Sequence, residues 1–213
     1  MMTIKKFIFS PFAVNTYVLS DDTGECIIID AACYIKKEEE ALAAYIKEKQ
    51  LTPMALVNTH CHLDHVFGNT FVSETYGLKP LAHKDEKPNN DFAAQAAENY
   101  GLTMAAPPPL EIFIDENSNL TFGNTELVIR HAPGHTKGSL VFFSEEAQAL
   151  IAGDVLFKDS IGRTDLPGGN FDTLKESIVT QLYTLDDDTS VLPGHGPETQ
   201  IGYEKRNNPF ITF

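Results

Sequence analysis

The segment His60-Cys61-His62-Leu63-Asp64-His65 brings three imidazoles and one carboxylate into six consecutive positions. Alternate side chains of an extended chain point to the same side, so His60 and His62 are expected to face one direction while Cys61 and Leu63 point into the core. Asp64 and His65 come at the turn into the next helix, where adjacent residues can face the same cavity. Imidazole and carboxylate groups are metal ligands, so this spacing predicts a metal site.

Three further ligand-type residues follow predicted strands. His135 lies in a Pro-Gly-His turn after the strand 126–130, Asp154 ends the apolar run 149–152, and His195 lies in a second Pro-Gly-His turn after the strand 191–192. Loops at strand ends, held by a rigid sheet, are the usual place for catalytic groups.

These seven side chains are more than a single ion needs. His60, His62 and His135 would give one ion three nitrogens; Asp64, His65 and His195 would hold a second, with Asp154 bridging the two. Each ion would keep an open position for water, as catalytic sites do. No cysteine belongs to the set, and an all-nitrogen and oxygen site suits two divalent ions, Zn²⁺ first, with Fe or Mn as alternatives. Of the other two histidines, His83 and His131, we expect structural roles.

The elements that must position these residues are short strands with interspersed helices. Apolar and β-branched runs predict strands at 13–19, 26–30, 54–58, 120–122, 126–130, 139–143, 149–152 and 191–192. Helical periodicity predicts helices at 36–50, 65–76 and 91–100, and a last helix capped by Asp172. Strand-rich segments with helices in both halves indicate sheets covered by helices, an α/β (α+β) class. The segment 85–109 is expected to be a surface excursion that lines or covers the pocket.

Length and composition restrict the number of domains, the possible partners and the location of the protein. The chain has 213 residues, 42% of them hydrophobic, which favours a single domain spanning 1–213. Sixteen Lys and Arg against 30 Asp and Glu give a net charge of −14, which disfavours nucleic-acid and anionic-membrane partners. The odd number of cysteines, three, is not typical of a disulfide framework and indicates a reducing, cytoplasmic location. The apolar stretch 7–19 is interrupted by Pro11 and predicts two strands rather than a leader.

The order His60-x-His62-x-Asp64-His65, then His135, Asp154 and His195, resembles the metallo-β-lactamase fold superfamily. Within that superfamily, the chain is similar to the short, single-domain members of the glyoxalase II-like (hydroxyacylglutathione hydrolase-like) branch, through residues 160–169 and 203–210 as well. The resemblance implies a four-layer αββα sandwich with a dinuclear metal centre at the sheet edge. It also implies a thioesterase that cleaves S-lactoylglutathione or a related acyl-thiol through a metal-bridging hydroxide.

Specific roles follow as hypotheses. Asp64 would orient the hydroxide and accept its proton, and Arg163, with Lys158 second, would bind the carboxylate of a small anionic thioester or ester. The chain departs from the branch in two ways. It is too short to hold the added helical domain of full-length glyoxalase II, and the Lys-x-Tyr glutathione contact reads Arg163-Thr164-Asp165, so the tyrosine is lost.

Other activities of the superfamily are the alternatives. β-Lactamases use a cysteine or lack an acidic ligand where Asp154 stands, and RNA-processing nucleases need a basic face. A persulfide dioxygenase, which binds one iron through two histidines and an aspartate, also resembles the chain through Gly162-Arg163-Thr164-Asp165. Metal stoichiometry and oxygen uptake distinguish this oxidoreductase from the hydrolase.

Overall fold

The computed structural model describes residues 1–211. Two six-stranded mixed sheets form its centre. The first sheet has the order β1 (Thr3–Phe9), β2 (Val14–Ser20), β3 (Glu25–Ile29), β4 (Thr52–Val57), β5 (Pro80–Ala82) and β6 (Ile112–Phe113). The second has the order β14 (Thr199–Gln200), β13 (Ser190–Pro193), β10 (Ala149–Gly153), β9 (Leu140–Ser144), β8 (Thr125–His131) and β7 (Leu120–Phe122). A small hairpin joins β11 (Leu156–Phe157) to β12 (Ser160–Ile161).

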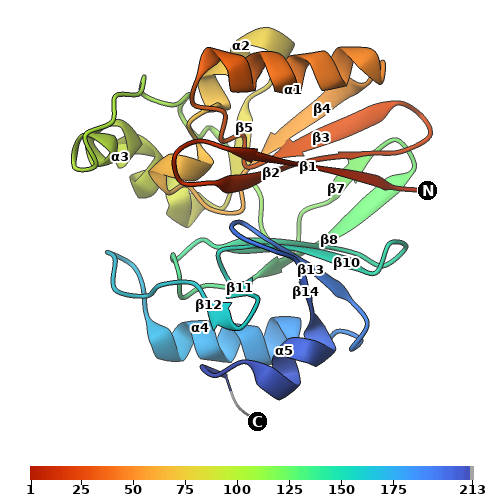
Figure 1. The fold of residues 1–213 in the computed structure, drawn as a ribbon, viewed down its shortest axis with the longest axis vertical. Coiled ribbons are helices and arrows are strands. Elements are labelled where there is room, and N and C mark those ends of the chain that lie inside the picture. The colour runs from red at the N-terminus through yellow and green to blue at the C-terminus, as the bar shows by residue number, and fades with distance from the viewer. Residues whose placement is uncertain (212–213) are drawn as a thin grey trace.

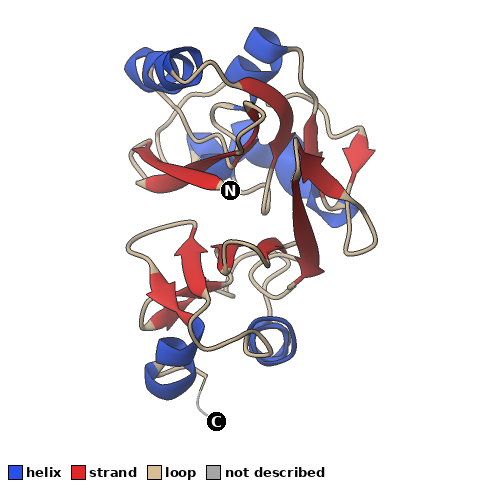
Figure 2. Ribbon diagram, turned by 90° about the vertical axis from the view of Figure 1, so that its right-hand side faces the viewer, coloured by secondary structure: helices blue, strands red, loops and turns tan. Residues whose placement is uncertain are grey.

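Helices cover the outer face of each sheet. The first sheet carries α1 (Lys36–Glu48), α2 (Asn69–Tyr76) and, at one end, α3 (Lys87–Glu98); the second carries α4 (Phe171–Ser177) and α5 (Ile201–Asn207). Figure 1 shows these layers from top to bottom as helices, sheet, sheet and helices, and Figure 2 shows the same order from the side. The predicted αββα sandwich is therefore confirmed.

Each sheet is buried on both faces, and alternate residues of a strand pack against different layers. In β3, Ile27 and Ile29 belong to the core between the sheets, whereas Cys26 and Ile28 pack beneath α1 and α2. In the same way β9 sends Leu140 and Phe142 to the inter-sheet core and its alternate residues toward α4. Because both faces are covered, these strands are near-continuous apolar runs rather than half-polar ones.

The predicted helix 65–76 is wrong at its beginning. Leu63–His65 form a 3₁₀ turn, and α2 starts only at Asn69. Between them Gly68 packs against the end of the first sheet: its amide donates to the Ala31 carbonyl at 2.7 Å, and a Cβ there would overlap Cys33 Sγ. This close approach interrupts the helix and separates Asp64 and His65 from it.

Two details of the C-terminal region also differ from the prediction. The cap of α4 is Asn170, whose side chain accepts from the Thr173 amide at 2.9 Å, so Asp172 lies in the first turn and does not cap the helix. The strand β13 is followed by β14 and α5, so α4 is not the last helix of the chain. Within the described residues, no helix has the length and apolar character needed to cross a bilayer.

Candidate metal centre

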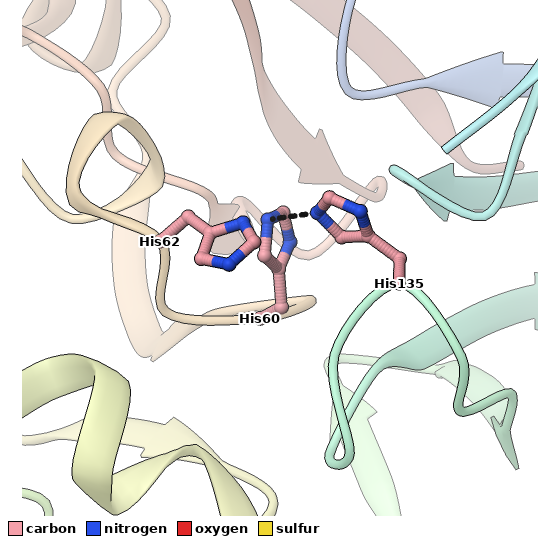
Figure 3. Close-up of side chains that lie close together, drawn as sticks. All are labelled: His60, His62 and His135. Atoms are coloured by element: carbon pink, nitrogen blue, oxygen red, sulfur yellow. Dashed lines mark hydrogen bonds between the residues drawn. The ribbon is translucent and has the colours of Figure 1, made fainter. Parts of the chain in front are cut away.

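His60, His62 and His135 form the first ligand cluster (Figure 3). His60 and His62 lie in the loop after β4, and His135 lies in the loop between β8 and β9. The Nε2 atoms of His60 and His135 lie 3.2 Å apart, and the His62 ring centroid is 4.6 Å from that of His135. The chain thus brings together three imidazoles separated by up to 75 positions.

Asp64, His65 and His195 form the second cluster. The Nε2 atoms of His65 and His195 lie 3.3 Å apart, and Asp64 Oδ2 is 3.4 Å from His195 Nε2 and 3.8 Å from His65 Nε2. Asp64 and His65 are presented by the 3₁₀ turn at 63–65, and His195 by the turn after β13.

Asp154 lies between the two clusters. Its carboxylate oxygens are 3.5 Å from His65 Nε2, 3.5 Å from His195 Nε2 and 3.7 Å from His135 Nε2. Its Oδ1 atom is buried and has no hydrogen-bond donor among the described residues. A buried carboxylate oxygen without a donor is costly, because its hydration is lost without replacement. A cation in contact with that oxygen removes the cost.

The hydrogen bonds of the imidazoles assign their protons. Nδ1 of His135 donates to the Arg163 carbonyl at 2.8 Å, and Nδ1 of His195 donates to the Phe12 carbonyl at 3.0 Å. A carbonyl can only accept, so in each neutral ring the proton is on Nδ1 and Nε2 carries a lone pair. The Thr59 hydroxyl donates to Asp30 and can therefore accept from Nδ1 of His60, at 3.1 Å.

The facing Nε2 atoms consequently fit metal ions. The Nε2 atoms of His60 and His135 are 3.2 Å apart and each carries a lone pair, so they repel unless a cation lies between them; the Nε2 atoms of His65 and His195 are 3.3 Å apart. Two nitrogens bound tetrahedrally at ~2.0–2.1 Å to one ion stand roughly 3.3 Å apart, which matches both separations. Both clusters, with Asp154 between them, therefore fit a pair of divalent ions.

Burial and neighbouring charges set the protonation of the free ligands. Burial, reinforced by the neighbouring histidines, holds the pKa of His60 well below its ordinary value and lowers the pKa of His62 to about 4. Burial works against ionisation of Asp64, but His65 and His195 outweigh it and the pKa of Asp64 falls below its ordinary value. Burial also works against the charged form of His65, but the Asp154 and Asp64 carboxylates outweigh it and raise the pKa of His65. The centre is a preformed arrangement of bases and carboxylates that attracts cations.

Asp30 and Thr59 orient the ligands, and neither was expected from the sequence. Asp30 directly follows β3, has φ +51° and is buried; its Oδ2 accepts from His65 Nδ1 at 3.0 Å, and its Oδ1 accepts from the Thr59 amide at 2.7 Å. A carboxylate on the outer nitrogen fixes the tautomer of a ligating histidine and raises its basicity. The signal was a carboxylate at the end of an apolar strand, the same feature that identified Asp154.

Glu86 is a second residue that sequence reasoning missed. Its side chain is fully buried, and it accepts from the Cys61 amide at 2.8 Å and from the Gly138 amide at 3.0 Å. Cys61 separates His60 from His62, and Gly138 lies in the loop of His135. One carboxylate therefore ties together the two loops of the first cluster. Nothing in the charged segment around Glu86 distinguishes it from a surface glutamate.

A cavity of about 640 Å³ opens beside the clusters and contains His62, Asp64, His135, Asp154 and His195 in its wall. Residues of α3 form one side, as expected for the segment 85–109, and residues 157–167 form the other. Arg163 lines this cavity, but Lys158 lies in a separate hollow with Glu198 and Tyr203. His83 and His131 stack on each other with ring centroids 4.5 Å apart and belong to neither cluster.

The chain is similar to two named proteins over almost its full length. It is 38% identical over 206 residues to the protein named probable metallo-hydrolase YqgX of Bacillus subtilis (strain 168), covering 94% of this chain and 93% of that protein. It is 36% identical over 213 residues to hydroxyacylglutathione hydrolase GloC of Haemophilus influenzae (strain ATCC 51907 / DSM 11121 / KW20 / Rd), covering 99% and 98%.

Two solved structures also match the chain over nearly its full length. The crystal structure of BLEG-1 B3 metallo-beta-lactamase superposes with a TM-score of 0.90 at 34% identity, covering 98% of this chain and 99% of that one. The crystal structure of TTHA1623 in a di-iron-bound form superposes with a TM-score of 0.87 at 33% identity, covering 97% and 100%. A model of the Metallo-beta-lactamase superfamily matches residues 9–195, which include every side chain of both clusters. This chain therefore belongs to the metallo-beta-lactamase superfamily.

Proposed function

We propose that this protein is a metal-dependent hydrolase that cleaves the acyl–sulfur bond of a thioester, S-lactoylglutathione or a related acyl-thiol. The observation that carries the proposal is the pair of three-ligand clusters with the Asp154 carboxylate between them. The relative named hydroxyacylglutathione hydrolase, 36% identical over 99% of this chain, supports the choice of a thioester.

His60, His62 and His135 would hold one ion, and Asp64, His65 and His195 the other, with Asp154 shared. Zn²⁺ is our choice because the donors are imidazoles and carboxylates, although the di-iron relative keeps iron as an alternative. When bound, a pair of such ions lowers the pKa of coordinated water and polarises a carbonyl oxygen.

The chain's own groups complete this chemistry. Asp64 reaches the cavity wall as a carboxylate, because His65 and His195 hold its pKa below the ordinary value. A strongly ionised carboxylate accepts a hydrogen bond well and stores a proton poorly. Asp64 would therefore orient the attacking water. His135 and His195 are held by the carbonyls of Arg163 and Phe12, so their nitrogens keep one direction during turnover.

The test combines metal analysis with a cleavage assay. Purified protein, incubated with S-lactoylglutathione, is expected to contain two metal ions per chain and to release free thiol without oxygen uptake. One iron per chain, with oxygen consumed in the presence of a persulfide, would replace this proposal with the persulfide dioxygenase. Because one solved relative is named a B3 metallo-beta-lactamase, hydrolysis of nitrocefin is measured in parallel; a β-lactam preferred to every thioester would also overturn the proposal.

A further inference from the structure

The wall of the cavity beside the clusters is largely apolar and includes four aromatic side chains. Phe12, Phe92, Tyr100 and Phe157 all line it. Phe92 and Tyr100 project from α3 and the turn after it, and they remain 49% and 52% exposed. Tyr100 meets Phe12 edge-on, with ring centroids 5.4 Å apart at 78°. Large apolar groups left in contact with water beside a reactive centre are typical of a site whose ligand covers them.

Among the described residues, the same wall offers a charged substrate a single cationic side chain, which is already paired with a carboxylate. Among the described residues, Arg163 is the one Lys or Arg that lines the cavity. Its Nε and Nη2 donate to the two carboxylate oxygens of Asp165, each at 2.7 Å. A guanidinium engaged in this paired geometry has two of its five N–H donors occupied and its charge partly compensated by the carboxylate. Lys158 points elsewhere, with Nζ over the Tyr203 ring at 5.8 Å from the centroid.

The remaining polar groups of the wall are uncharged. Asn89, Asn99 and Ser160 line the cavity outside the clusters, and amides and hydroxyls can bond to a carboxylate without neutralising it. The net charge of −14 adds a long-range repulsion of anions. A carrier such as glutathione, which presents two carboxylates, would therefore find no unpaired cationic side chain in this wall.

We infer that the substrate of this hydrolase is a thioester with an uncharged, apolar acyl group, which packs against Phe12, Phe92 and Tyr100. This inference rests on the proposed thioesterase function and assigns its substrate class. In the reaction, the oxygen of one water forms a bond to the acyl carbon as the carbon–sulfur bond breaks. The sulfur leaves with the electron pair and takes up one proton, and the carboxylic acid releases its own proton at neutral pH. The carrier thiol is not recognised through carboxylates.

The experiment compares S-hexanoyl and S-lactoyl esters of one neutral thiol, N-acetylcysteamine, with S-lactoylglutathione, using the metal-loaded enzyme. Each kcat/KM is divided by the rate of hydroxide-driven hydrolysis of the same ester, which removes intrinsic reactivity. The hexanoyl ester is expected to exceed the lactoyl ester by about tenfold or more, since a hydrophobic pocket discriminates by at least about this factor for one methylene and hexanoyl has three more carbons than lactoyl and no hydroxyl. S-lactoylglutathione is expected to be no better than S-lactoyl-N-acetylcysteamine.

Substitutions in the cavity wall test whether its aromatic residues cause the preference for the hexanoyl ester. Phe92→Ala and Tyr100→Ala should lower the hexanoyl-to-lactoyl ratio several-fold, mainly through KM, with unchanged metal content. Phe171→Ala is the matched control, because Phe171 is 42% exposed at the start of α4 and lies outside the cavity. Asp165→Asn should free Arg163 and raise kcat/KM for S-lactoylglutathione several-fold.

The outcomes separate the two proposals. A preference for the lactoyl ester, or a ratio that both aromatic variants leave unchanged, overturns the apolar substrate class while the thioesterase stands. Failure of the two-metal enzyme to hydrolyse any of these esters overturns the proposed function, and the substrate class with it.

Discussion

Replacing Glu86 removes the single carboxylate that joins the two loops of the first ligand cluster. Its oxygens accept from the Cys61 amide at 2.8 Å, from the Gly138 amide at 3.0 Å and from Asn89 Nδ2 at 2.9 Å. Glu86→Ala leaves two buried amides without an acceptor, at about 1–3 kcal/mol each, so we expect the free energy of unfolding to fall by about 2–6 kcal/mol. Glu86→Gln keeps one acceptor but turns an amide NH₂ toward the other backbone N–H, so about half of that loss remains.

Replacing Glu86 should weaken the binding of one metal ion more than that of the other. Cys61 and Gly138 lie in the loops of His60, His62 and His135, so one of the two bound ions should weaken by about 10–100-fold, as loss of supporting contacts does elsewhere. The second cluster has no direct contact with Glu86 and should keep its affinity. Urea unfolding of the metal-free protein and chelator competition with Zn²⁺ measure the two effects separately.

Glu111→Gln is the control for this experiment. Glu111 forms an exposed ion pair with Lys79, and such a pair contributes about 0–1 kcal/mol. Ordinary surface substitutions change the free energy of unfolding by no more than about 0.5 kcal/mol. A Glu86→Gln variant that stays within this range of the wild type and binds both ions unchanged would refute the role assigned to Glu86.

Four other predictions test separate parts of the protein. Asp154→Asn and His62→Ala should each lower bound metal and kcat by orders of magnitude; metal content and activity near wild type in both would contradict the ligand assignment. Gly194→Ala would place a Cβ in overlap with Asp154 Oδ1 and 2.8 Å from His65 Cε1, so metal content should fall. Gly196→Ala meets no neighbouring atom and bears only the backbone strain of φ +74°, so it should retain both ions. Removal of metal with a chelator should abolish thioester cleavage, and Zn²⁺ should restore it; activity that survives complete removal contradicts a metal-dependent reaction. The Thr23 hydroxyl, with the Asn124 amide, lowers the pKa of Asp21 from 3.8 to about 2, so this group stabilises the fold above pH 3.8 and the contribution is lost as the pH falls toward 2. Urea unfolding across that range should show a weaker pH dependence for Asp21→Asn than for the wild type, and parallel curves would disprove the role.

Much of the fold could be predicted from local patterns. The apolar runs at 26–30 and 149–152 correspond to strands whose sheets are covered on both faces. Strands buried on both faces are near-continuous apolar runs, so composition alone identifies them. The split between Leu63–His65 and α2 could not be predicted, since it depends on the contact of Gly68 with Ala31 and Cys33, far away in the sequence. Helix α5 was also missed, because its seven residues follow a Gly/Pro-rich turn and form too short a pattern to be recognised.

By itself, the sequence determined which side chains could serve as ligands, because imidazoles and carboxylates at strand ends are recognisable from residue type and spacing. Only the tertiary structure decided how those ligands are supported. Asp30 and Glu86 act through hydrogen bonds to residues 35 and 25 positions away, and no local pattern encodes such a distance. The pairing of Arg163 with Asp165 and the aromatic wall formed by Phe12 and Tyr100 likewise exist only once the loops have been placed. The physical reason is that residue type fixes what a group can bind, whereas its neighbours in space fix its charge, its orientation and its access to a substrate.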